Sequence, residues 1–236
     1  MAGAVPLGRT NLVGQSGVRR ISFLFPKATL KLYLASANPG KLREFREAAG
    51  ARGILLESVP DICSLPPCVE DGLTFEANAR KKALHYSTHT DGLVFADDSG
   101  ICVDALNRAP GVHSARFAGP DADDDANNQK LLTELRRVEE SNATKAGLPP
   151  SRAAHYVCVI VMAQKARALT IVDGRVDGII IDSPRGSGGF GYDPYFFYPP
   201  LGKTFAEITT EEKFTVSHRG SAFRRLLDSL SKVPRP

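Results

Sequence analysis

The sequence predicts an α/β fold, built either as one large domain or as two small lobes. Its 236 residues and 42% hydrophobic content are sufficient for a sizeable buried core. The segment 30–35 alternates like a strand and runs through a tight turn into a helical pattern. Two long β-rich segments, 152–164 and 167–181, follow later in the chain. Strands mixed with helices in this way are typical of the α/β class.

Composition narrows the classes of function. The net charge of +4 is mild and fits either a small anionic substrate or weak contact with nucleic acid. No apolar run approaches the ~20 residues of a membrane span, and without Trp there is no clear aromatic platform for nucleic acid. Cys63, Cys68, Cys102 and Cys158 form no C-x-x-C pair. The cysteines therefore predict reduced thiols and a cytoplasmic location. The charge, the apolar runs and the aromatic content predict neither a membrane nor a nucleic-acid partner.

The first 29 residues have a composition of their own. They contain four basic residues and no acidic one, and the first acid of the whole chain is Glu44. A transit peptide has this bias, and so does a disordered tail or a mis-assigned start. We predict that 1–29 is an extension of one of the latter two kinds, and that 30–236 forms a single domain.

The turn Ser36–Lys41 joins the first strand to the first helix. A turn at a helix start offers free backbone N–H groups and a positive dipole end to a phosphate. Ser36 and Asn38 add side-chain donors, and Lys41 adds a charge. The pattern is shorter than a Walker P-loop. Its plain alternative is a helix N-cap made by Ser36 or Asn38.

The segment from 53 to 86 predicts a strand, a loop and a helix in that order. The strand covers 53–59 and the Pro-containing loop covers 60–68. Glu70-Asp71-Gly72 then leads into a helix whose apolar face consists of Phe75, Ala79, Ala83 and Tyr86. The basic cluster Arg80–Lys82 on this helix is typical of a solvated face.

The stretch Phe95–Val103 holds an acidic pair. Residues 93–96 predict a short buried strand, and Asp97 and Asp98 follow at its end. Buried unpaired carboxylates are costly, so a cation beside the pair is one explanation. The other is an ordinary β-turn, because Asp-Asp-Ser-Gly, with Gly100 as the turn glycine, is common turn chemistry.

The acidic run 121–125 opens a further predicted helix, where negative charge suits the helix dipole, so we interpret it as capping and not as a metal site. A polar connector, 141–151, follows. The segments 152–164 and 167–181 predict an antiparallel or mixed pair of strands with a turn around Lys165.

Two later segments carry polar groups at loop and helix ends. The glycine loop 186–194 presents an aromatic ring and a carboxylate, although it fits an ordinary long loop as well. Lys213 precedes the last helix, which His218 and Arg219 open. A cation at a helix N-terminus opposes the dipole, so a nearby anion or acceptor explains Arg219 better than a plain surface position does.

Seven motifs occur in collinear order between residues 32 and 230. They are S-A-N-P-G-K at 36–41, G-L-T-F at 72–75 with Asn78 and Lys82, A-D-D-S-G at 96–100, A-P-G-V-H-S-A-R-F-A-G at 109–119, G-G-F-G-Y-D-P at 188–194, G-K-T-F-A-E at 202–207 and S-H-R at 217–219. In this combination the chain closely resembles the Ham1-type inosine triphosphate pyrophosphatases. It departs from their pattern at Ala77, where Glu is common and Glu76 lies one residue earlier, and at His113, where Tyr is common.

The resemblance implies a fold and an activity. The fold is α/β, with two lobes around a central mixed β-sheet, flanking helices, the nucleotide cleft between the lobes, and usually a homodimer. The activity is Mg2+-dependent hydrolysis of ITP, dITP and XTP to the monophosphate and pyrophosphate. Mg2+ fits such a site, because one or two carboxylates and the substrate phosphates are enough to hold it.

The resemblance also implies roles for individual residues. Asp98 would activate water, and Glu70 and Asp98 would bind the metal. Independently of the resemblance, phosphoryl transfer needs charge neutralisation, and Lys41 and Lys82 are our candidates for it. The substrate would be bound by Ser36, Ala37, Asn38, Pro39, Gly40, Lys41, Ser99, Phe190, Gly191, Tyr192, Asp193, Lys213, His218 and Arg219.

Two other functions compete with this one. A Maf-type nucleotide pyrophosphatase has a similar layout, but the S-H-R and F-G-Y-D motifs weaken that reading. A basic nucleic-acid-binding protein is a different class, and the mild charge and scattered aromatic residues argue against it.

Overall fold

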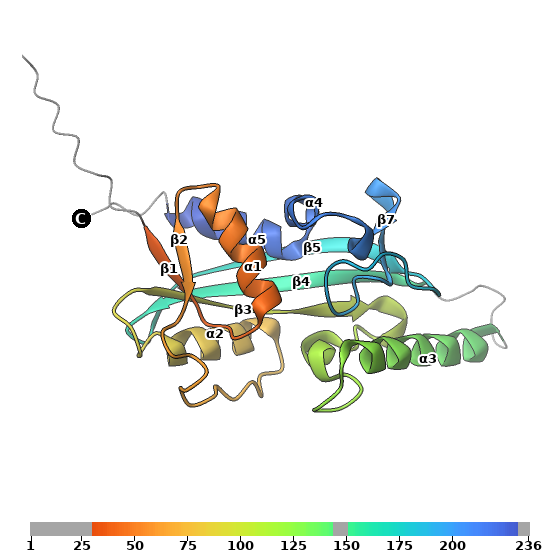
Figure 1. Cartoon of the computed structure of the whole chain (residues 1–236). Helices are drawn as coiled ribbons and strands as arrows, with labels where there is room; N and C mark the ends of the chain where they lie inside the picture. Colours follow the sequence, from red (N-terminus) through yellow and green to blue (C-terminus); the bar gives the residue numbers. More distant parts are fainter. Residues whose placement is uncertain (1–29, 144–150, 231–236) are drawn as a thin grey trace, which may run out of the picture.

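The computed structural model describes residues 30–143 and 151–230, so the predicted extension 1–29 and most of the predicted connector lie outside it. Its strands form one mixed seven-stranded sheet in the order β2-β1-β3-β4-β5-β6-β7 (Figure 1). β1 is parallel to β2 and β3, and the later neighbours are antiparallel. The strands are β1 (Lys31–Leu34), β2 (Leu55–Ser58), β3 (Leu93–Val103), β4 (Ala153–Gln164), β5 (Arg167–Ile180), β6 (Phe196–Tyr198) and β7 (Lys203–Thr204).

Helices flank the sheet on both sides. In Figure 1, α1, α4 and α5 lie above the long strands, and α2 and α3 lie below them. The helices are α1 (Pro39–Gly50), α2 (Phe75–Tyr86), α3 (Asp124–Ala143), α4 (Thr210–Val216) and α5 (His218–Leu230), with short 3-10 turns η1 (Asp104–Leu106), η2 (Gly111–Arg116), η3 (Pro199–Leu201) and η4 (Phe205–Glu207). The predicted α/β class, with a mixed sheet and flanking helices, is confirmed. None of the helices in the described ranges is long and apolar enough to cross a membrane.

β3 is much longer than the predicted strand 93–96. β1 pairs with β3 only as far as Leu34 opposite Phe95, whereas β4 pairs with β3 along its whole later part, up to Val103. Asp97 and Asp98 therefore lie inside a strand, at a point where β1 no longer pairs with it and before its later residues, from Ile101 on, bond to the segment 109–114. The predicted strand end and turn at this point are wrong, because long-range pairing with β4 overrides the local turn preference.

The alternation of side chains along β3 separates the two carboxylates. Asp97 lies on the same face as Phe95, which packs with α1 and α5 in one hydrophobic core. Asp98 lies on the same face as Ala96, which packs with α2 in another core. The two neighbouring acids consequently meet different partners, one set from each layer of helices.

Gly174 of β5 allows the start of α5 to lie close against the sheet. A Cβ atom there would meet the main-chain oxygen of His218 and the main-chain nitrogen of Ala222 at less than normal contact distance. We expect Gly174→Ala to lower the free energy of unfolding by about 1–3 kcal/mol, since backbone atoms must move. Urea denaturation would measure this. Gly50→Ala is the control, because nothing lies within 4 Å of its added Cβ. Equal stability of the two variants would contradict the packing argument.

Candidate active site

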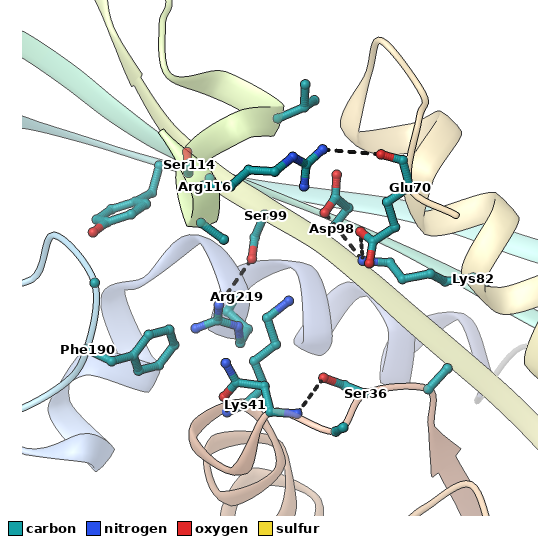
Figure 2. Close-up of a pocket in the computed structure, with 18 of the residues that line it drawn as sticks. Ser36, Lys41, Glu70, Lys82, Asp98, Ser99, Ser114, Arg116, Phe190 and Arg219 are labelled. Atoms are coloured by element: carbon teal, nitrogen blue, oxygen red, sulfur yellow. Dashed lines mark hydrogen bonds and ion pairs between the residues drawn. The ribbon is translucent and has the colours of Figure 1, made fainter. Parts of the chain in front are cut away.

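A pocket of about 490 Å³ lies beside β3 where β1 ends, and Asp98, Ser99 and Gly100 of β3 line it. Every residue predicted to bind substrate or metal or to act in catalysis lines it, except Pro39 and Gly40. Figure 2 shows β3 crossing the pocket between two groups of side chains. Glu70, Lys82, Asp98 and Arg116 lie on one side of the strand, and Ser36, Lys41, Phe190 and Arg219 lie on the other.

Lys82 connects the two predicted metal ligands. Its Nζ lies 2.7 Å from Glu70 Oε2 and 3.3 Å from Asp98 Oδ1. The Asn78 side-chain amide donates to Asp98 Oδ2 at 3.2 Å and accepts from the Gly72 main-chain N–H at 2.7 Å. Lys82 is buried, so the prediction of a solvated basic cluster fails for it. Neighbouring side chains on a helix point in different directions, so Lys82 faces the inside of the protein while Lys81 remains exposed.

Burial shapes the electrostatics of this group. It raises the pKa of Asp98, although Lys82 and Lys41 act in the opposite direction. For Lys82, burial opposes the charge, but Asp98, Asp97 and Glu70 outweigh it and raise the pKa of the ammonium group. The result is a permanently charged lysine beside a carboxylate whose proton affinity is increased. A carboxylate of this kind is suited to accept a proton from water.

Asp97 lies on the other side of β3 and holds the phosphate-turn lysine. Lys41 Nζ is 2.9 Å from Asp97 Oδ2, and the Ser99 hydroxyl donates to the same oxygen at 3.1 Å. Arg219 Nε lies 3.8 Å from it. Burial alone would raise the pKa of Asp97, but the charges of Lys41 and Arg219 lower it far below its usual value. Asp97 is thus a fixed negative charge.

The predicted phosphate turn is also a conventional helix start. Asn38 is the N-cap of α1, and its side-chain oxygen accepts from the Lys41 N–H at 3.0 Å. The Ser36 hydroxyl accepts from the Asn38 N–H at 3.2 Å. Both side chains predicted as donors therefore act as acceptors within the turn. This satisfies part of the helix terminus, while Lys41 supplies the charge that reaches into the pocket.

A buried network of charges lies at the end of the pocket that is opposite to Glu70 and Lys82. Glu44 Oε2 lies 2.5 Å from Arg219 Nη1, and Glu44 Oε1 lies 3.1 Å from Lys213 Nζ. Lys213 Nζ also lies 2.6 Å from Asp193 Oδ2. Burial would raise the pKa of Glu44, but the two cations lower it. The anion expected beside Arg219 is therefore present, as Glu44 with Asp97 nearby.

Phe190 covers this network. Its ring lies 4.8 Å from Lys213 Nζ and 5.4 Å from the guanidinium carbon of Arg219, and these are cation–π distances. The Phe190 N–H donates to Asp193 Oδ2 at 2.9 Å, which fixes the loop. Burial raises the pKa of Asp193, and Lys213 partly offsets that effect.

His218 lines the pocket at the end where Phe190 and Arg219 lie. Its ring stacks on Tyr156 at 4.6 Å between centroids and 8° between planes. Burial, followed by the charges of Arg219 and Lys213, lowers the pKa of His218 well below its usual value, so the ring is neutral. Among the described residues its buried Nδ1 has no hydrogen-bond partner.

The glycine loop is fastened by an acid that we predicted only as a helix cap. Asp124 Oδ2 accepts from the Gly191 N–H at 2.6 Å, and Asp123 caps the helix instead, by accepting from the Ala126 N–H. Tyr192 is buried and donates its hydroxyl to the Ser114 carbonyl at 2.8 Å. Tyr192 thus supports the pocket wall from behind the loop.

Sequence reasoning missed the structural partners of the site. Glu44, Asp97, Asn78 and Asp124 each hold a predicted site residue in place. Glu44 looked like an ordinary residue of the first helix, and its only signal was its position as the first acid of the chain. The pairing of Glu44 with Arg219 joins residues 175 positions apart, which no local pattern can reveal.

The carboxylates at the Lys82 end fit a hard divalent cation. Glu70 and Asp98 both contact one ammonium nitrogen, so their oxygens converge on one small region. No group of three or more His, Cys, Asp or Glu residues in the described ranges is arranged to hold a metal. Two carboxylates alone match Mg2+, which keeps several waters and shares phosphate oxygens with a substrate.

Comparisons with known proteins agree on one family. The model of the Ham1 family matches residues 32–229. A dITP/XTP pyrophosphatase of Syntrophobacter fumaroxidans is 44% identical over 202 residues, covering 86% of this chain and 82% of the relative. One from Desulforamulus reducens is 41% identical, with 86% and 97% covered. The solved structure of a HAM1 protein from Coxiella burnetii has a TM-score of 0.75 and 38% identity, covering 87% of this chain and all of that one.

Proposed function

The chain belongs to the Ham1 family, and on that premise we propose that it hydrolyses the non-canonical purine nucleotides ITP, dITP and XTP to the monophosphate and pyrophosphate. Relatives named dITP/XTP pyrophosphatase support this activity. The family match does not favour the Maf-type alternative. One observation carries the proposal for the site: a single pocket is lined by residues of the Ser36–Lys41 turn, by Glu70 and Asp98, and by Asp193, Lys213 and Arg219.

Release of pyrophosphate in one step requires water to attack the α-phosphorus. The new P–O bond forms as the bond to the pyrophosphate oxygen breaks, and the water loses a proton. Asp98 accepts that proton in this proposal, because its raised pKa and its position beside Lys82 suit a general base. Lys41 and Lys82 neutralise the phosphate charge, so catalysis rests on positioning and electrostatics.

We propose Mg2+ as the cofactor, held by Glu70 and Asp98. When bound, it would supply positive charge to the phosphate oxygens. The protein's own contribution is to keep the two carboxylates converged through Lys82 and to orient Asp98 through Asn78.

The base would lie at the Phe190 end. A 6-oxo purine presents an acceptor where adenine presents an amino donor, so N–H groups favour hypoxanthine and xanthine. Arg219 and Lys213 are such groups, but Glu44 and Asp193 already occupy part of their hydrogen-bonding capacity. Nη1 and Nη2 of Arg219 each donate one bond, to Glu44 and to the Ser99 hydroxyl, so in this proposal the second N–H of each nitrogen is left for the base. Unpaired polar groups discriminate strongly between substrates.

A pyrophosphate-release screen tests the activity. It would compare ITP, dITP and XTP with the common nucleotides, with Mg2+ present and after its removal by a chelator. We expect release from the three non-canonical nucleotides only with Mg2+ present. Equal rates on ATP and GTP would contradict the proposed selectivity, and unchanged rates with chelator would contradict the cofactor.

Lys41→Ala tests the phosphate turn. We expect affinity for ITP to fall by about tenfold or more, because a charge-assisted hydrogen bond to phosphate is lost. Affinity for IMP should change much less, since the monophosphate lacks the outer phosphates. Calorimetric titration of both ligands measures this. Equal losses for ITP and IMP would show that Lys41 does not bind the outer phosphates. The exposed Lys165, whose partner Asp91 lies on the surface, provides the control Lys165→Ala.

We also propose that the protein is a cytoplasmic homodimer without a nucleic-acid partner. Sedimentation analysis would give the oligomeric state. Filter binding over a salt series would detect nucleic-acid binding, because such binding weakens steeply as salt rises.

A further inference from the structure

Arg116 is a pocket cation that the roles above leave unused. It is the last residue of η2, lines the pocket and is half-buried. Its Nη2 donates to the main-chain oxygen of Glu70 at 3.2 Å. In Figure 2 its side chain lies on the same side of β3 as Glu70, Asp98 and Lys82.

Arg116 differs from the other lysines and arginines of the pocket in its partner. Lys41, Lys82, Lys213 and Arg219 each lie within ion-pair distance of at least one carboxylate. Among the described residues, Arg116 contacts a carbonyl oxygen and no carboxylate. Its positive charge therefore has no ion-pair partner among the described residues, and most of its guanidinium N–H groups remain available to a ligand.

The position of Arg116 is fixed from both sides. The Ser114 hydroxyl accepts from the Ile101 N–H at 2.9 Å and so ties η2 to β3. Asn127 of α3 donates to the Ala115 carbonyl at 3.2 Å and accepts from the Ala118 N–H at 2.8 Å. These bonds lie on either side of Arg116 along the chain. These bonds hold the main chain at Arg116, so binding a ligand there costs the order of the side chain and not of the whole loop.

The local charge balance favours a polyanion. At this end the carboxylates of Glu70 and Asp98 are matched by Lys82 and Arg116, so the four side chains are neutral as a set. A divalent cation would make the set positive, and a phosphate chain would restore the balance. Arg is well suited to such a partner, because its planar fork matches two oxygens of one phosphate.

We propose that Arg116 binds the phosphate chain at the carboxylate end of the pocket and holds the pyrophosphate as it leaves. This inference rests on the proposed function and adds a substrate-binding residue to it. A purely structural alternative exists, in which Arg116 only ties η2 to Glu70. Binding of a phosphate chain requires the positive charge of Arg116, whereas the bond to the Glu70 main-chain oxygen requires only an N–H donor.

Arg116→Gln tests the charge, because Gln removes it and keeps a polar amide on a shorter side chain, while the melting temperature reports any loss of the contact with the Glu70 main chain. The measurements are inhibition of ITP hydrolysis by inorganic pyrophosphate, kcat/KM for ITP, and the melting temperature. We expect the inhibition constant for pyrophosphate to rise about 10- to 100-fold, with an unchanged melting temperature. Arg116→Lys keeps the charge and should recover much of the affinity. Arg80→Ala is the control, since it removes one positive charge from an exposed pair on α2.

Three outcomes of these measurements would contradict the proposed role of Arg116. If Arg116→Gln is inhibited by pyrophosphate as strongly as the wild type, Arg116 does not bind the phosphate chain, and the proposed function stands. If both Gln and Lys lower the melting temperature and weaken inhibition equally, the role is structural. If the wild type itself releases no pyrophosphate from ITP, the proposed function fails and this inference fails with it.

Discussion

Asp98→Asn is expected to lose nearly all turnover of ITP while the protein remains folded. The carboxylate is the proposed proton acceptor and shares Lys82 with Glu70, and its removal takes away both the base and a metal ligand. Loss of a general base typically lowers kcat by ~10²–10⁴-fold. The amide is nearly isosteric and its oxygen still accepts from Asn78, so the structure should persist. Steady-state kinetics with pyrophosphate detection would measure the loss.

The control for this variant is Asp71→Asn. Asp71 lies next to Glu70 in the chain but is exposed and pairs with Lys81 on the surface. We expect its kcat to equal that of the wild type. Near-normal turnover of Asp98→Asn, with a normal melting temperature, would remove Asp98 from the chemistry and point to another base. A large change in KM with a small change in kcat would indicate substrate binding instead.

Arg219→Ala is expected to have the largest effect on stability. Its guanidinium lies between the buried carboxylates of Glu44 and Asp97, and the side chain is 4% exposed. Removing one member of a buried network leaves its partners as unpaired charges, which costs about 3–5 kcal/mol. Arg225→Ala is a matched control on the same helix, because its pair with Asp173 is exposed. Exposed pairs contribute about 0–1 kcal/mol.

The pH dependence of this loss identifies its cause. In the wild type, Arg219 and Lys213 lower the pKa of Glu44, so the stability that Glu44 contributes is present above its unfolded pKa and is lost as pH falls through the folded value. In Arg219→Ala that depression is weakened, and the acid becomes neutral more readily on acidification. The stability difference between variant and wild type should therefore shrink as pH is lowered from 7 toward 4. A difference that stays constant would attribute the loss to packing alone.

Base selectivity needs to be measured on the folded fraction of that variant. We expect kcat/KM for ITP to fall strongly and the slow reaction with ATP to change little. The preference for ITP over ATP should therefore become smaller. An unchanged ratio of ITP to ATP rates would assign the discrimination to Lys213, His218 or the Phe190–Asp193 loop.

The sequence by itself determined the class of the fold and most of the pocket lining. Hydrophobic periodicity predicted the first strand and helix, the β4-β5 pair and the last helix, and the structure confirms them. The collinear motifs indicated the family and brought together the Ser36–Lys41 turn, Asp98 and Arg219 in one pocket. Local patterns succeed here because an element's period and the capping of its ends are set by neighbouring residues.

The tertiary structure alone decided how those residues are held. It extended β3 beyond Asp98 through pairing with β4, turned Lys82 inward, and placed Glu44 against Arg219 and Asp97 against Lys41. These contacts join residues 16 to 175 positions apart. Desolvation and ion pairing, which set the charge of each group, depend on distance in space and on burial. Neither quantity is encoded in local sequence spacing.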